Sequence, residues 1–518
     1  MRYPITLSIR WTLALPFAAM VAMESAQGQH VHGVAPGARL GRVSFASSCA
    51  ASVQPAFERG VALLHSFWYE EAARSFAQVV HGDPRCAFGY WGSAMSRLHP
   101  LWAPPTPADY AAGRVAARKA VEASRAGSRP RRWAEAIDRY FERYESVDHP
   151  ARLRAYESAM RDVAKAEPGD EEAQIFYALV LIADGQQDAT DTTHARQRQA
   201  ARILEPLYRR HPDHPGLAHY LIHAYDSPAL AGEGVRAAER YADIAPSVPH
   251  ALHMPSHIYV RVGRWEDVIA SNLRSAEAGR RFERAQGKHA LWDQRAHALD
   301  YLVYGQLQLG RGREAEVVAA ELGEVKETFP GGAITTDYAL AAIPARVALE
   351  RNRWADAVSL PLRAAPAWPG TEAITHFARA IGAARSGRPP RARAEVDTLA
   401  QLERTLAALG GAQTYWSGQV AIQRLAAGAW VALADRDTAA ALRLAAEAAD
   451  REDRSEKPPV TPGPVLPARE LYADLLLSIG RRDEAGREYQ AVLTRQPGRS
   501  RSLAGLAATR AAGASTAQ

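Results

Sequence analysis

The feature that most constrains the fold of this chain is a recurring spacing: a small residue, a large apolar residue four positions later, and Pro twelve positions after the small residue. The spacing occurs at Ala72, Phe76 and Pro84, at Ala200, Leu204 and Pro212, and at Ala485, Tyr489 and Pro497. The small residue lets two paired helices approach, the large residue fills the space between them, and Pro ends the unit. The chain is therefore expected to fold as a series of antiparallel helix pairs.

A regular period in the middle of the chain supports this expectation. The interval from Pro212 to Pro246 equals the interval from Pro215 to Pro249, and it defines a repeat of about 34 residues. Within each repeat the later of the two Pro residues, Pro215 or Pro249, is expected in the first turn of a helix, where its missing N–H costs nothing. From about residue 51 onward apolar residues follow the helical period, and alternating strand patterns are absent. These patterns predict an all-α, right-handed helical-repeat solenoid over residues 51–512, in which each repeat contacts only its neighbours.

Two stretches interrupt the rhythm of helix pairs. Residues 101–130 begin with a Pro-rich run and continue as a long helix rich in Ala and Arg, and residues 453–467 contain five Pro. Both are expected to be insertions on the solenoid, and the second is expected to be an exposed loop before the last repeat.

Residues 1–28 have the pattern of a secretory signal peptide. Arg2 and Arg10 supply the charges of the n-region, and an apolar run extends from Trp11 to Met23. This run is shorter than the roughly 20 residues needed to span a bilayer. Cleavage after Gly28 is expected to release a periplasmic or secreted protein without a membrane span.

The mature chain is expected to start with a leading segment, residues 29–50, and to end in a disordered tail, residues 513–518. Its two cysteines, Cys49 and Cys86, are expected to form a disulfide, because an exported protein meets an oxidising environment. Two separate buried thiols are the alternative. Two cysteines are too few for a disulfide scaffold or a Cys-based zinc site.

Several blocks of the sequence resemble a known family. These blocks are LLHSFWYEEAARSF, DPRCAFGYWGSAMSRLHPLW, GLAHYLIHAYDSP, PHALHMPSHIYVRVGRW and HALDYLVYGQLQLG. They are similar to a family of exported bacterial tetratricopeptide-repeat (TPR) proteins, and the resemblance covers about residues 45–310. That family has no firmly assigned activity, so the resemblance implies a fold and export but no reaction.

The charge pattern argues against a nucleic-acid-binding protein. The chain has 63 Lys and Arg against 57 Asp and Glu, a net charge of +6. Basic and acidic residues alternate, as in REDRSEK, whereas nucleic-acid-binding proteins usually gather their basic residues on one face. The expected partner is a protein or peptide segment.

The histidines show the most specific chemical pattern in the chain. Seven of the 17 His lie between residues 211 and 257, and two pairs have i,i+4 spacing: His219 with His223 and His253 with His257. The second pair follows the first by one full repeat, so both pairs occupy the same place on the first helices of consecutive repeats. His297, Asp226 and Asp300 fall on the same or the next first helix.

These seven residues form the predicted metal-ligand set, suited to a divalent transition metal such as zinc, copper, iron or manganese. The break expected at Pro255, between two of the histidines, is typical of a functional or strained site. The alternative is a structural polar network copied with the repeat. Neither HYLIH nor HMPSH has the Glu of a zincin motif, so any catalytic base would come from elsewhere, such as Asp226 or Asp300.

Two functions therefore follow from the sequence, and no reaction is predicted. The first is an exported scaffold that binds a peptide or protein through a concave groove lined by first helices. The second is a metal-binding protein or metal-dependent enzyme that uses the histidines.

Overall fold

The structure is a computed structural model that describes residues 37–511, except residues 103, 189, 364, 365, 367, 412 and 458. The predicted signal peptide and the predicted C-terminal tail lie outside the described residues. None of the helices in the described ranges has the length and hydrophobicity needed to cross a bilayer.

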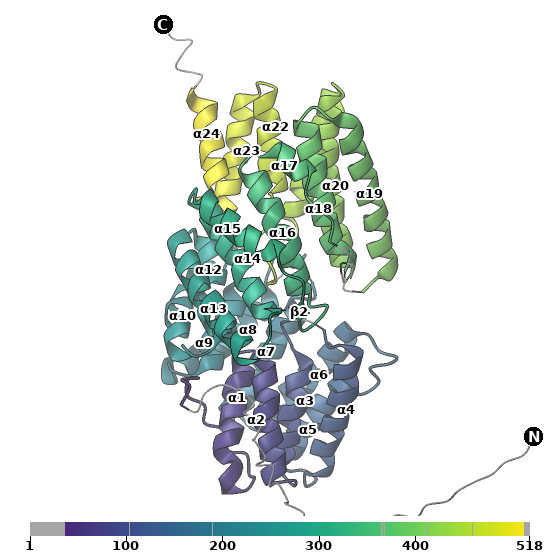
Figure 1. The fold of residues 1–518 in the computed structure, drawn as a ribbon. Coiled ribbons are helices and arrows are strands. Elements are labelled where there is room, and N and C mark those ends of the chain that lie inside the picture. Colours follow the sequence, from purple (N-terminus) through teal and green to yellow (C-terminus); the bar gives the residue numbers. More distant parts are fainter. Residues whose placement is uncertain are drawn as a thin grey trace, which may run out of the picture.

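The first half of the chain forms consecutive antiparallel helix pairs (Figure 1). A short 3-10 helix, η1 (Ala51–Val53), precedes them. The α-helices are α1 (Gln54–His65), α2 (Tyr69–Gly82), α3 (Ala87–Leu98), α4 (Pro107–Glu122), α5 (Arg129–Phe141), α6 (His149–Ala166), α7 (Glu171–Gly185), α8 (Ala195–Arg210), α9 (Pro215–Tyr225) and α10 (Ala231–Ile244).

The second half continues the same arrangement to the C-terminus. Its helices are α11 (Pro249–His253), α12 (Pro255–Val262), α13 (Trp265–Ala285), α14 (Asp293–Gln308), α15 (Gly312–Gly323), α16 (Ile334–Glu350), α17 (Trp354–Val358), α18 (Pro369–Arg385), α19 (Pro389–Leu409), α20 (Gln413–Ala434), α21 (Thr438–Asp453), α22 (Ala468–Ser478), α23 (Arg482–Arg495) and α24 (Ser500–Ala511). Two short strands, β1 (Leu291–Trp292) and β2 (Thr328–Phe329), pair in parallel beside them.

Local sequence explains where many of these helices begin. Thr106 and Asp109 form a capping box at the start of α4, and the carboxylates of Asp148 and Asp170 accept N–H groups in the first turns of α6 and α7. Pro occupies the first turn of α9, α11 and α12, and the repeat spacing predicts this for α9 and α11.

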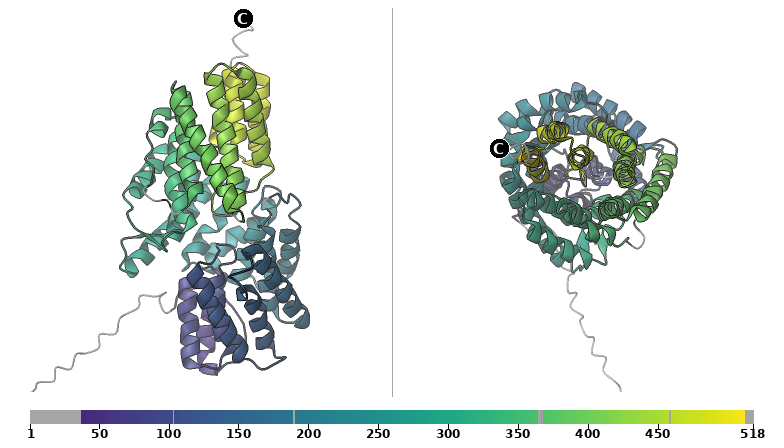
Figure 2. Two further views of the ribbon diagram at one scale, coloured as in Figure 1. Left: turned by 90° about the vertical axis from the view of Figure 1, so that its right-hand side faces the viewer. Right: turned by 90° about the horizontal axis from the view of Figure 1, so that it is seen from above.

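The helix pairs stack into a solenoid. Each helix packs on the next in sequence, and first helices also pack on first helices of the following pair, as α14 does on α16 and α16 on α18. Viewed from above, the pairs curve around a common axis (Figure 2). This arrangement confirms the predicted all-α solenoid of helix pairs.

Two details of the sequence prediction are wrong. The long helix within residues 101–130 is not an insertion, because α4 packs against both α3 and α5 as the second helix of a regular pair. Residues 453–467 do not form an exposed loop. The part of this stretch between residues 456 and 467, here called the inner segment, contacts α14 and α16, with Thr461, Pro462 and Gly463 buried.

Side-chain donors explain why a Pro-rich segment can be buried. Pro has no N–H, so the segment mainly needs donors for its carbonyl groups. The Arg346 guanidinium on α16 donates to the carbonyls of Gly463 and Pro464, each at 2.9 Å. The Tyr301 hydroxyl on α14 lies 3.2 Å from the carbonyl of Pro459 and 3.1 Å from that of Thr461.

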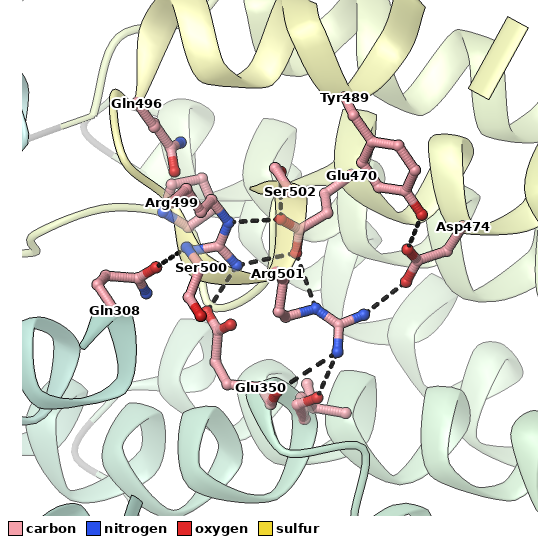
Figure 3. Close-up of polar contacts among 12 residues, drawn as sticks. Gln308, Glu350, Glu470, Asp474, Tyr489, Gln496, Arg499, Ser500, Arg501 and Ser502 are labelled. Carbon is pink, nitrogen blue, oxygen red and sulfur yellow. Dashed lines mark hydrogen bonds and ion pairs between the residues drawn. The ribbon is translucent and has the colours of Figure 1, made fainter. Parts of the chain in front are cut away.

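A cluster of buried ion pairs fixes the C-terminal repeats against the middle of the solenoid (Figure 3). Arg499, just before α24, donates to Glu470 on α22 at 2.7 and 3.0 Å and to Glu350 at the end of α16 at 2.6 Å. Arg501 joins Glu470 at 2.9 Å and Asp474 at 2.5 Å. Arg499 and Glu470 are both 0% exposed. These contacts tie α22 and α24, which follow the inner segment, to the end of α16.

Candidate metal centre

Six histidines meet where four helices adjoin: α9, α11, α12 and α14. All six are buried, with exposed fractions between 0% and 5%. They are His219, His223, His250, His253, His257 and His297. The predicted pairs thus lie beside each other, but in an enclosed interior and not in an open groove.

Pro255 shapes this interior. It begins α12, so the first helix of this repeat is divided at Met254 into α11 and α12. His253 ends α11 and His257 lies on α12. The Ser256 hydroxyl donates to the His253 carbonyl at 2.7 Å and thereby satisfies one of the acceptors freed by the break.

The histidines form two separate groups of three. His253, His257 and His297 each offer one ring nitrogen to the first group, and these nitrogens all lie within 4.8 Å of one another. In particular, Nε2 of His253 lies 3.0 Å from Nε2 of His257. The histidines of the single predicted ligand set are therefore divided between two adjacent groups.

Hydrogen bonds determine the tautomers of the first group. Nδ1 of His253 lies 2.6 Å from Oδ1 of Asn272, whose own Nδ2 donates to the Val268 carbonyl, so Nδ1 of His253 carries the proton. Nδ1 of His257 lies 2.9 Å from the Asp226 carboxylate and carries a proton for the same reason.

Both facing Nε2 atoms therefore hold lone pairs in the neutral rings. Nδ1 of His297 lies 3.2 Å from the carbonyl of Val460 in the inner segment, which also leaves its Nε2 with a lone pair. Two lone pairs 3.0 Å apart repel each other unless a cation lies beside them. Burial lowers the pKa of His253, His257 and His297, so a proton is disfavoured in that role.

Outer contacts hold this group in place. Asp226 accepts from His257, from Arg261 at 2.9 Å and from Lys457 at 3.2 Å. Lys457 belongs to the inner segment, so the segment touches the site through both Lys457 and Val460. A ring nitrogen of a ligand held by a carboxylate, amide or carbonyl is the usual arrangement in metal centres.

The second group contains His219, His223 and His250. Nδ1 of His219 lies 2.6 Å from the His65 carbonyl, and its Nε2 lies 3.1 Å from Nε2 of His223. Nδ1 of His223 and Nε2 of His250 are buried without a hydrogen-bond partner among the described residues. Ligand nitrogens of the three residues lie within 4.8 Å of one another.

A third cluster nearby, His65, Glu172 and His214, has different bonding. Glu172 accepts from His65 at 2.9 Å and from His214 at 3.0 Å. The second nitrogen of His65 lies 2.9 Å from the Tyr220 hydroxyl, and that of His214 accepts the Leu217 N–H. Every ring nitrogen of these two histidines has a partner, so this cluster is a complete hydrogen-bond network that needs no metal.

Aromatic rings enclose the six histidines. Phe67 lies with its ring centroid 4.3 Å from that of His219, and Trp102 lies 5.2 Å from His250 and 5.3 Å from His297. Tyr301 stacks on His257 at 4.9 Å. These rings exclude water, which strengthens any interaction between imidazole nitrogens and a cation.

The structure places two of the predicted ligand residues outside the ligand positions. Asp226 holds His257 through Nδ1 and so orients a ligand. Asp300 lies against Arg346, with an ion-pair distance of 3.2 Å, and burial raises the pKa of its carboxyl group to about 6. Its position therefore makes it a partner of the arginine that holds the inner segment.

Sequence reasoning missed His250, Asn272 and the inner segment. His250 has no histidine counterpart in the previous repeat, where Gly216 stands, because the His65 ring fills that space: a Cβ on Gly216 would lie 2.4 Å from Nδ1 of His65. The one sequence signal for His250 is its place directly after Pro249, on the same helix as His253. Nothing in the sequence points to Asn272 or to residues 457–460.

The predicted disulfide partners also meet. The Cα atoms of Cys49 and Cys86 are 5.1 Å apart and their side chains are joined as a disulfide. The bond ties the leading segment to the start of α3.

Comparisons with known proteins give no family. No family model matches the chain, and no curated protein matches it. Solved structures similar to it include the TPR domain of P58(IPK), at 14% identity over 90% of this chain and 100% of that chain with a TM-score of 0.22. They also include yeast Tom70, at 12% identity over 90% and 96% of the two chains with a TM-score of 0.35.

A third similar structure is Naa15/Naa10 bound to HypK-THB, at 13% identity over 86% of this chain and 64% of that chain with a TM-score of 0.22. Scores this low carry no conclusion about function. The assignment as a solenoid of helix pairs therefore rests on the helices themselves.

Proposed function

We propose that this protein binds a divalent transition metal ion through His253, His257 and His297. The observation that carries the proposal is the 3.0 Å contact between Nε2 of His253 and Nε2 of His257, both of which hold lone pairs. Imidazole nitrogens suit zinc, copper and iron, and three protein ligands leave a coordination position for water or a small molecule.

The enclosure of the site determines how a ligand could reach this position. The six histidines are at most 5% exposed, and the inner segment contacts the site through Val460 and Lys457. An ion bound here is held within the solenoid, and access for a small molecule requires the inner segment or an aromatic ring to move.

We propose further that the protein is exported, as the pattern of residues 1–28 predicts. The disulfide between Cys49 and Cys86 supports this location, because such bonds persist in oxidising compartments. A protein in the periplasm or outside the cell would obtain its metal there.

Metal analysis of the purified chain tests the proposal. The protein is stripped with a chelator, incubated in separate samples with zinc, copper, iron or manganese, desalted and analysed for bound metal. Wild type is expected to retain zinc, His253→Ala to lose the ion of this site, and His211→Ala, at an exposed histidine, to bind as wild type does. A folded wild-type protein that retains no zinc, copper, iron or manganese contradicts the proposal.

Peptide binding is a second candidate, favoured by how the chain binds its own inner segment. Arg346 and Tyr301 hold that segment by its backbone carbonyls, and residues of the segment line a cavity of about 90 Å³. A surface that binds a peptide through its backbone carbonyls can bind peptides of many sequences.

A chain whose residues 456–464 are replaced by a Gly–Ser linker tests this idea. A synthetic peptide with the sequence EKPPVTPGP is expected to bind that chain, and to bind less when Arg346→Met is added. Failure of the peptide to bind the replaced chain contradicts a peptide-binding inner face.

A further inference from the structure

We infer that His219, His223 and His250 form a second metal site beside the first, so that the protein holds two transition metal ions. This inference goes beyond the proposed function, and the two sites share no ligand residue. It rests on two nitrogens, one on His223 and one on His250, that are buried without a hydrogen-bond partner among the described residues, and on the position of the three rings.

The protons in this group are too few and wrongly placed for a hydrogen-bond network. Nδ1 of His219 uses its N–H on the His65 carbonyl at 2.6 Å, so Nε2 of His219 holds a lone pair. If His223 donates to that lone pair across 3.1 Å, its own Nδ1 is left buried as an acceptor without a partner. If it carries the proton on Nδ1, two lone pairs face each other and the N–H has no partner.

His250 adds a further unpartnered nitrogen. Its Nε2 is buried without a hydrogen-bond partner in the part of the chain that the structure describes, while the residue itself is 2% exposed and its ring centroid lies 5.0 Å from that of His219. Buried polar groups in proteins are nearly always paired, so two orphaned imidazole nitrogens in one cluster indicate a missing ligand. Ligand nitrogens of the three residues lie within 4.8 Å of one another, close enough to bind one ion after small side-chain movements.

The His65–Glu172–His214 cluster shows that burial of histidines alone does not create this deficit. It is as deeply buried, at 0% to 6% exposed, yet its histidine nitrogens all have partners because Glu172, Tyr220 and a backbone N–H serve them. No carboxylate reaches the second histidine group in this way among the described contacts. A cation would bind the imidazole lone pairs that no donor serves in the second group, just as Glu172 accepts the N–H groups of the neighbouring cluster.

The two sites adjoin without sharing a bridge. Ring centroids of His223 and His257 are 5.8 Å apart, and so are those of His250 and His253. Histidine rings, and not a carboxylate, lie between the two points, so the ions are expected to bind as separate centres. Because two divalent charges so close together repel, the second ion is expected to bind more weakly than the first.

Cobalt titration of the chelator-stripped, full chain tests the inference, because bound Co²⁺ absorbs visible light and its stoichiometry can also be measured by mass spectrometry. Wild type is expected to bind two Co²⁺ per chain. His250→Phe and His297→Phe are each expected to bind one, and His211→Phe, at an exposed position, two. Phe is chosen for His250 because that ring already packs among Phe67 and Trp102.

The outcomes separate this inference from the proposed function. One ion per chain in wild type, lost in His297→Phe and kept in His250→Phe, overturns the second site and leaves the first. One ion lost only in His250→Phe supports the second site and contradicts the first. If His250→Phe does not fold by circular dichroism, His250→Gln, which keeps polarity at the position, gives the same readings.

Discussion

Asn272 offers a direct test of how the first site works, because it touches no metal ion and acts only through His253. Its Oδ1 accepts from Nδ1 of His253 at 2.6 Å, which keeps the lone pair on Nε2. In Asn272→Leu that acceptor is gone, so the His253 proton can move to Nε2 and donate to His257 across 3.0 Å. This tautomer removes one metal ligand and relieves the repulsion in the metal-free protein.

The expected magnitude follows from the role of such partners in metal centres. Loss of an outer hydrogen bond typically weakens metal affinity 10- to 100-fold. At a free zinc concentration 100 times the wild-type Kd, binding stabilises wild type by about 2.7 kcal/mol. The same concentration is expected to stabilise Asn272→Leu by only about 0.4 to 1.4 kcal/mol.

The assay is urea unfolding with and without zinc, and the measured quantity is the difference between the two free energies of unfolding. Ser275→Ala is the matched control: its hydroxyl lies on the same helix and donates to the Pro249 carbonyl at 2.8 Å, without contact to an imidazole nitrogen. It is expected to lower stability in both conditions equally and to keep the full effect of zinc. A zinc effect in Asn272→Leu equal to that of wild type would refute the tautomer argument.

Three further outcomes are expected. Arg499→Met should lower the free energy of unfolding by about 3–5 kcal/mol, because it leaves the buried Glu350 carboxylate without its ion-pair partner and leaves Glu470 with Arg501 alone. Arg481→Met, in an exposed pair, should leave urea unfolding unchanged, and equal effects of the two substitutions would contradict the buried-pair argument. Replacing both Cys49 and Cys86 by Ser should lower the free energy of unfolding by about 4 kcal/mol, because the disulfide closes a loop with a sequence separation of 37 residues. The thermal midpoint of this variant should not change with reductant, and continued sensitivity to reductant would contradict the bond. Burial raises the pKa of Glu452 to about 8. The free energy of unfolding of wild type should therefore fall by up to about 1.4 kcal/mol per pH unit as the pH rises from 4.5 to 8, because Glu452 ionises in the unfolded chain before it ionises in the folded one. Glu452→Gln should reduce this slope in urea unfolding, and an unchanged slope would contradict the pKa shift.

The sequence was informative about the fold because its signals are local. The small–large–Pro spacing and the regular repeat length specify helix pairs whose contacts are mostly between neighbours in sequence, as the packing of α9 on α10 shows. The same register aligned the pair His219 and His223 with the pair His253 and His257, and the structure brings the two pairs together, with the ring of His223 beside that of His257.

Where the prediction of the site differed, the deciding contacts were ones that the repeat pattern does not describe. The register could not show that His250 completes one group of three, since Gly216 stands at the corresponding position of the previous repeat. Nor could it show that Asp300 pairs with Arg346, which belongs to the following first helix.

By itself, the sequence determined that this chain forms helix pairs, where several first helices begin, and that histidines recur on one face of them. Each of these depends on residues within one repeat length of one another. Only the tertiary structure decided that the histidine face is enclosed and divided into two groups. Asn272 reaches His253 from the second helix, and Lys457 reaches Asp226 from 231 residues away. The physical reason is that the position of the inner segment against these helices depends on the curvature of many successive repeats. A pattern within one repeat does not predict that curvature.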